Sequence, residues 1–214
     1  IFEGNKYEGE TFLPILETFK HKYKIDKLTV VSDAGLLSKA NVEQLISKGY
    51  HFILGARIKN EPQSIKEQIL RLRLNNGESV VLAKDGHSLI ITYSEQRAKK
   101  DKHNRERGLI KLEKQVTSGR LTKSSINNRG YNKFLELDGA ISIKIDYKKI
   151  ETDALWDGLK GYLTNSDMSK EEILDNYKQL WQIEKAFRVA KNELKIRPVY
   201  HRKQRRIEAH ICIN

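Results

Sequence analysis

Two acidic side chains that are distant in the sequence occupy positions where chemistry is expected. Asp33 directly follows LTVVS, a short β-branched run with the length of a buried strand, and about 150 residues later Glu184 interrupts the apolar face of a helical segment. Carboxylate oxygens suit Mg²⁺, and two such ions about 4 Å apart can activate a hydroxyl and stabilise the leaving oxygen of a phosphoryl displacement. The pair suggests metal-dependent phosphoryl transfer, although any chain of this size contains many Asp and Glu pairs.

The segment around Glu184 has the pattern of one long amphipathic helix from Glu171 to Leu194. Ser169 and Glu172 form a capping-box signature at its start, and Arg197-Pro198 supplies a stop signal beyond its end. The apolar positions recur at helical spacing and predict a buried stripe: Ile173, Tyr177, Leu180, Trp181, Phe187 and Leu194.

Glu184 and Lys191 lie one heptad apart on this predicted stripe. A carboxylate and an ammonium group on a core-facing surface cost free energy unless they have partners. A metal, a nucleic acid or the other member of the pair could be that partner. The alternative is that Glu184 reaches water at the rim of the helix, or that the two residues form an ordinary surface ion pair.

The elements before and after Asp33 predict how it is positioned. Residues 9–24 and 38–49 are predicted helices, and residues 27–32 and 50–56 are predicted buried strands. This α-β-α-β order implies a parallel sheet, and ligands of such sheets gather at the carboxyl ends of the strands. Asp33 lies at such an end.

Composition indicates a polyanionic partner. The 214 residues carry a formal net charge of +12 and have a pI near 9.6, so nucleic acid is the leading expectation, and a basic charge that serves only solubility is the alternative. Cys212 is the single cysteine, which excludes an internal disulfide and fits a cytoplasmic setting. No segment has the length of a membrane span.

We expect three parts: residues 1–77, a mainly β insertion at residues 78–165 that contains a charged helix at 95–115, and a helical part at residues 166–214. The chain begins at Ile1 rather than methionine, and it ends in an apolar-periodic stretch, so we expect a piece of a larger protein. The predicted strands of the insertion are 79–83, 88–93, 133–137, 141–146 and 161–164.

Basic residues are concentrated in two places. Residues 97–107 form a run that is more often a solvated helix face than a binding surface. The tail from Arg197 to Arg206, which includes Arg202 and Tyr200, could contact phosphates or could be a solvated turn.

The helix also carries a specific signature. In YKQLWQIEKAFRVAK, the spacing of Tyr177, Leu180, Glu184 and Lys191 resembles the tyrosine-arginine-glutamate-lysine signature of bacterial insertion-sequence transposases, the DDE enzymes with a ribonuclease H-like core. The resemblance covers nearly the whole chain, since VVSDAGLLS, WDGLKGYLTN, IRPVYHR and RRIEAHI are similar to that group as well.

The resemblance implies a fold, a metal site and a partner. The fold would be α/β, a ribonuclease H-like mixed sheet flanked by helices and interrupted by the insertion. Asp33 and Glu184 would be catalytic metal ligands for Mg²⁺ or Mn²⁺, with two ions in the complete site. The partner would be double-stranded DNA at terminal inverted repeats, bound by a homodimer. DNA contacts would come from Tyr177, Lys191, Arg188, Trp156, Arg197 and Arg202.

Two departures from the family pattern matter. Leu180 replaces the signature arginine, a loss for which Arg188 could compensate. The first catalytic aspartate has no counterpart, because Asp26 is the only Asp before Asp33 and lies in a turn. The resemblance therefore implies two of three metal ligands, with the first aspartate on a strand upstream of Ile1. Trp156 could stack on a flipped base, although a Trp in a β segment is usually part of the core.

The leading hypothesis is a transposase catalytic fragment that binds DNA and belongs to a Mg²⁺-dependent strand-cleaving and strand-transferring enzyme of the bacterial cytoplasm. Because one carboxylate is missing, we expect little or no activity from the chain alone. The alternative is a catalytically incomplete DNA-binding remnant or regulatory fragment. An unrelated basic RNA-binding protein would require the signature to be accidental.

Overall fold

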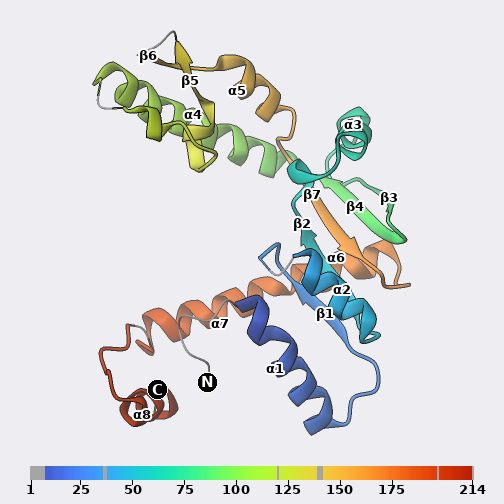
Figure 1. Cartoon of the computed structure of the whole chain (residues 1–214). Coiled ribbons are helices and arrows are strands. Elements are labelled where there is room, and N and C mark those ends of the chain that lie inside the picture. The colour runs from blue at the N-terminus through green and yellow to red at the C-terminus, as the bar shows by residue number, and fades with distance from the viewer. Residues whose placement is uncertain (1–7, 36–37, 120, 139–141, 197, 214) are drawn as a thin grey trace. The chain divides into compact units, whose positions relative to one another are not determined.

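The computed structural model describes residues 8–35, 38–119, 121–138, 142–196 and 198–213 (Figure 1). It is a mixed α/β structure with helices flanking a five-stranded sheet, so the predicted fold class is confirmed. The strand order is β1 (Thr29–Ser32), β2 (His51–Ala56), β7 (Leu159–Thr164), β4 (His87–Tyr93) and β3 (Ser79–Lys84). None of the helices in the described ranges combines the length and apolar character of a membrane span.

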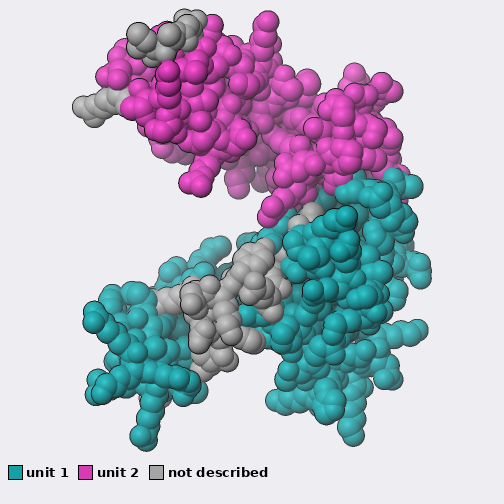
Figure 2. Space-filling model, viewed as in Figure 1, with its two compact units in different colours: residues 1–56, 83–89, 162–214 teal, residues 57–82, 90–161 magenta. Residues whose placement is uncertain are grey.

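Two compact units divide the chain, as the two colours of Figure 2 show. The first contains residues 1–56, 83–89 and 162–214, and the second contains residues 57–82 and 90–161. These units do not test the predicted boundaries at 77 and 165, which stay predictions.

The first unit is built on the parallel pair β1 and β2, in which Thr29 lies opposite His51 and Ser32 opposite Leu54. Ser38 caps α2 (Lys39–Ser47) by accepting a hydrogen bond from the Asn41 amide at 3.1 Å. With α1 (Glu8–Tyr23), these elements enclose a core of Leu13, Val30, Leu45, Tyr50, Phe52, Leu54 and Leu163.

Side chains at the end of β7 and directly after it bind the backbone of β2 and of the residue before it. The buried Thr164 hydroxyl donates to the Phe52 carbonyl at 2.6 Å. Asn165 accepts from the Phe52 amide at 2.8 Å and donates to the Tyr50 carbonyl at 3.0 Å. Because Asn165 offers both a donor and an acceptor, one amide satisfies two backbone groups at the start of β2.

The predicted long helix is divided into α6 (Lys170–Lys178) and α7 (Leu180–Asn192), and α8 (Gln204–Ile213) follows. The capping box of Ser169 and Glu172 is confirmed. The prediction of one buried stripe along the whole segment is wrong. Ile173 and Tyr177 are buried because α6 packs against β1 and β2, whereas Trp181 and Phe187 on α7 are 58% and 60% exposed.

The second unit is centred on α4 (Glu95–Thr117), whose N-cap is Ser94. It also contains α3 (Gln63–Arg71), the antiparallel pair β5 (Leu135–Asp138) and β6 (Ser142–Ile145), and α5 (Tyr147–Ala154). Three short 3₁₀ helices lie at Ile58–Asn60, Lys123–Ser125 and Gly130–Phe134. One core cluster of this unit consists of Leu112, Phe134, Leu135 and Ile150.

Asp153 pairs with two lysines in the second unit. Its carboxylate accepts hydrogen bonds from Lys59 at 2.7 Å and Lys133 at 2.8 Å. Burial acts to raise the pKa of Asp153, but the hydrogen bonds from Lys133 and Lys59 outweigh it, so the pKa lies below its ordinary value.

A carboxyl group with a depressed folded-state pKa contributes stability above its unfolded pKa of about 4, and this contribution is lost as the pH falls through the folded pKa. We therefore expect Asp153→Asn to destabilise the chain at pH 7 and to cost progressively less below about pH 4. Urea unfolding of both proteins between pH 7 and pH 2 measures the difference. A difference that stays constant with pH would contradict this role of Asp153.

Candidate functional site

Asp33 lies directly after β1, at the carboxyl end of a strand, as predicted. Its side chain is exposed, and its Oδ1 accepts a hydrogen bond of 2.7 Å from the Gly35 amide. This local turn orients the carboxylate. Its Oδ2 has no hydrogen-bond partner among the described residues, so it can bind a ligand from solvent.

Tyr177 approaches the end of β1 from α6. Its ring packs edge-to-face on Tyr162, with 4.6 Å between the centroids, and its side chain is 9% exposed. A Cβ atom at Gly55 would lie 2.5 Å from the Tyr177 hydroxyl, 3.0 Å from the Ala34 amide nitrogen and 3.4 Å from the Asp33 carbonyl carbon. The Tyr177 hydroxyl and the backbone of Asp33 therefore converge on the bare backbone of Gly55.

Sequence reasoning missed Gly55. The available signal was a glycine inside the apolar strand sequence HFILGA, which often marks a close approach by another group. Gly55 connects the tyrosine of the signature to the segment that carries Asp33.

Glu184 lies on α7, seven residues or about two helical turns beyond Tyr177. The chain is locally tightened between them, where the Gln182 amide donates to the Gln179 carbonyl at 3.0 Å. The Glu184 side chain is exposed and has no hydrogen bond or ion pair among the described residues. The argument that Glu184 needs a partner because it is buried is therefore wrong, since water solvates its carboxylate.

The predicted DNA-contacting residues differ in their environments. Lys191 and Arg188 are exposed on α7, and Arg202 is exposed before α8. Arg197 lies outside the described residues. Trp156 belongs to the second unit and is only 8% exposed, so base stacking on its indole would require a local rearrangement.

Asp33 and Glu184 supply exposed carboxylate oxygens, which is the donor chemistry of a Mg²⁺ site, so the two residues fit such an ion as ligands. In the described part of the chain, no group of three or more His, Cys, Asp or Glu side chains could hold a metal. No third protein ligand is therefore identified.

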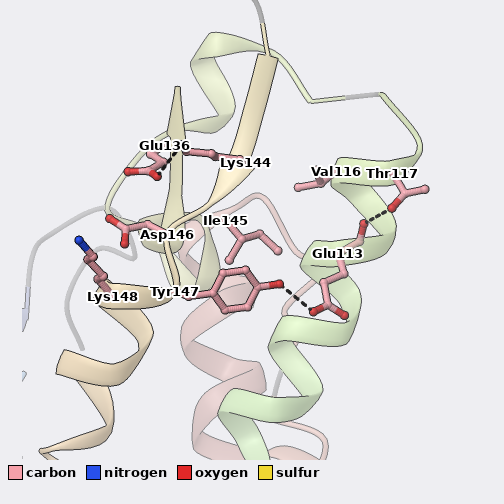
Figure 3. Close-up of a pocket in the computed structure, with 9 residues that line it drawn as sticks. All are labelled: Glu113, Val116, Thr117, Glu136, Lys144, Ile145, Asp146, Tyr147 and Lys148. Carbon is pink, nitrogen blue, oxygen red and sulfur yellow. Dashed lines mark hydrogen bonds and ion pairs between the residues drawn. The ribbon is translucent and has the colours of Figure 1, made fainter. Parts of the chain in front are cut away.

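A cavity of about 780 Å³ lies elsewhere, in the second unit (Figure 3). Its acidic residues have partners: Glu113 accepts from the Tyr147 hydroxyl at 3.4 Å, and Glu136 pairs with Lys144 at 3.6 Å. Asp146 caps α5, and the hydrogen bond from the Lys149 amide is the largest influence that lowers its pKa. This cavity contains none of the predicted catalytic residues.

The mixed sheet flanked by helices, with an exposed aspartate after β1, defines an α/β protein of the ribonuclease H-like class. The sequence model of the transposase DDE domain matches residues 1–214. The chain belongs to this family, which acts in DNA transposition, binds DNA and generally uses divalent metal ions. Comparison with curated proteins and with solved structures gave no match.

Proposed function

We propose that the chain is the part of an insertion-sequence transposase that supplies Asp33 and Glu184 for DNA strand cleavage and transfer. The observation that carries the proposal is the convergence at Gly55, where the signature tyrosine meets the backbone next to Asp33. Glu184 follows on the adjoining helix with its carboxylate exposed. Asp33 and Glu184, the two acidic residues that the family resemblance marks as metal ligands, both belong to the first unit.

Asp33 and Glu184 would each hold Mg²⁺ or Mn²⁺ through a carboxylate oxygen. Such ions, two in the complete family site, activate the attacking oxygen and neutralise charge on the phosphodiester. The exposed cations Arg188, Lys191 and Arg202 would bind the phosphates of the DNA. Trp156 ranks lower among the proposed DNA contacts because its side chain is only 8% exposed.

Terminal inverted repeats are the proposed substrate. Two copies of the chain related by twofold symmetry would match the two inverted ends. With DNA as the substrate, the protein would act at the bacterial nucleoid.

A second function is a noncatalytic DNA-binding or regulatory role. It is favoured by one observation, namely that the described residues contain no group of three or more His, Cys, Asp or Glu side chains that could hold a metal. This role needs the basic surface but no metal.

Calorimetric titration with Mn²⁺ distinguishes the two functions. The chain should bind Mn²⁺, and Asp33→Asn and Glu184→Gln should each weaken binding about tenfold or more because each removes a ligand. Asp26→Asn and Glu193→Gln, which remove exposed carboxylates seven and nine residues away in the sequence, are matched controls and should leave binding unchanged. No Mn²⁺ binding, together with intact DNA binding, would support the noncatalytic role instead.

A further inference from the structure

Three of the eight Lys and Arg side chains of α4 have carboxylate partners. Arg105 is nearly buried in a bidentate pair with Asp157, at 2.5 and 2.6 Å. Arg97 pairs with Asp101 at 3.6 Å, and Lys102 pairs with Glu106 at 4.0 Å. These contacts account for half of the basic run that the sequence singled out.

The other five, which include Lys99, have no such partner among the residues that the structure describes. Lys100, Arg107, Lys111 and Lys114 are exposed, and none of them forms an ion pair with any residue that the structure describes. At about 100° per residue, these four side chains and His103 lie within about 80° of one another around the helix axis. We name Lys100, Arg107, Lys111 and Lys114 the α4 stripe.

The acidic residues of α4 avoid this sector. Glu95, Asp101, Glu106 and Glu113 all lie at least about 60° outside it. Ordinary solvated helices intersperse both signs of charge, which gives favourable pairs at i,i+4. The stripe instead holds like charges beside one another, an arrangement that costs free energy in the isolated protein and favours a polyanion.

An aromatic residue borders the stripe. The Tyr131 hydroxyl donates to the Asn104 carbonyl of α4 at 2.7 Å, and its ring covers Gly108, where a Cβ atom would overlap the ring. Tyr131 is 38% exposed. Its ring thus lies on α4 next to the sector that contains Arg107 and Lys111.

We propose that the α4 stripe is a second DNA-backbone surface, located in the second unit and separate from the residues assigned to the metal site. From Lys100 to Lys114 the stripe is about 21 Å long. B-DNA presents roughly twelve phosphate charges over that length, so all four cations can have a phosphate partner. The inference rests on the proposed function only for the identity of the polyanion as DNA.

The test compares two variants of the full chain that lose the same charge. The stripe variant carries Lys100→Gln, Arg107→Gln, Lys111→Gln and Lys114→Gln. The control variant carries Lys22→Gln, Lys27→Gln, Lys39→Gln and Arg71→Gln, all at exposed positions outside α4. Affinity for a 40-base-pair duplex of mixed sequence is measured by fluorescence anisotropy in EDTA at several salt concentrations.

Each lost phosphate contact reduces the slope of log affinity against log salt by about 0.9, so the stripe variant should have a slope shallower by about 2 to 4. The control variant should change the slope by less than about 1. Equal slopes for the two variants would overturn the proposal while leaving the proposed function intact. Failure of the parent chain to bind DNA at all would contradict the DNA-binding function itself. Circular dichroism verifies that both variants retain their helices.

Discussion

Replacing Arg105 with alanine is expected to lower the free energy of unfolding by about 3 kcal/mol. The side chains of Arg105 and Asp157 are only 11% and 18% exposed, and their two hydrogen bonds have the parallel geometry that arginine forms with carboxylates. The hydrogen bonds to Asp157 raise the pKa of Arg105, so the contact favours the charged guanidinium. Without Arg105, the carboxylate of Asp157 would be left poorly solvated and without its cation.

Urea unfolding measures this loss, and two further variants locate its cause. Lys102→Ala removes a cation from the same helix, but its pair with Glu106 spans 4.0 Å between exposed side chains, so we expect a loss below about 1 kcal/mol. Arg105→Lys keeps the charge but not the bidentate geometry and should restore only part of the stability. Similar losses for Lys102→Ala and Arg105→Ala would show that the Asp157 pair has no special role.

Local signals were sufficient to predict most elements of the fold. The capping box at Ser169, the N-cap at Ser38 and the β-branched run before Asp33 depend on neighbouring residues, and each element occurs where they indicate. The α4 helix was also predicted within two residues of its ends. The predicted strand at 133–137 begins later, because residues 130–134 form a 3₁₀ turn.

The predictions that failed depend on tertiary contacts. Periodicity indicates which residues of a helix share a face, but it does not say how far the covering sheet extends. The apolar stripe predicted between Glu171 and Leu194 is therefore buried at Ile173 and Tyr177 and exposed from Trp181 onward. The break at Gln179 has no glycine or proline to announce it.

The candidate site was predictable only in part. Asp33 could be located at the end of a strand because that position follows from local pattern. The convergence of Tyr177 and Asp33 on Gly55 brings together three segments that are distant in the sequence, and no local signal specifies it. The catalytic roles of Asp33 and Glu184 stay predictions.

Gly55→Ala is expected to destabilise the chain by about 1 to 3 kcal/mol and to impair the binding of Mn²⁺ at Asp33. The new methyl group would lie 2.5 Å from the Tyr177 hydroxyl and 3.0 Å from the Ala34 amide nitrogen, and real Cβ atoms do not tolerate the first distance. Either α6 or the segment after β1 must move. Both movements change the position of Tyr177 relative to Asp33.

A double-mutant cycle identifies the contact responsible. Tyr177→Phe removes the hydroxyl that the methyl group would meet, so Gly55→Ala should cost about 1 kcal/mol less in the Tyr177→Phe background than in the parent. The remaining cost would come from the Ala34 backbone, which Tyr177→Phe does not change. Urea unfolding of the four proteins gives the coupling free energy. Strict additivity would mean that Gly55 and Tyr177 do not share this contact, and the link from the signature helix to Asp33 would then have to be abandoned.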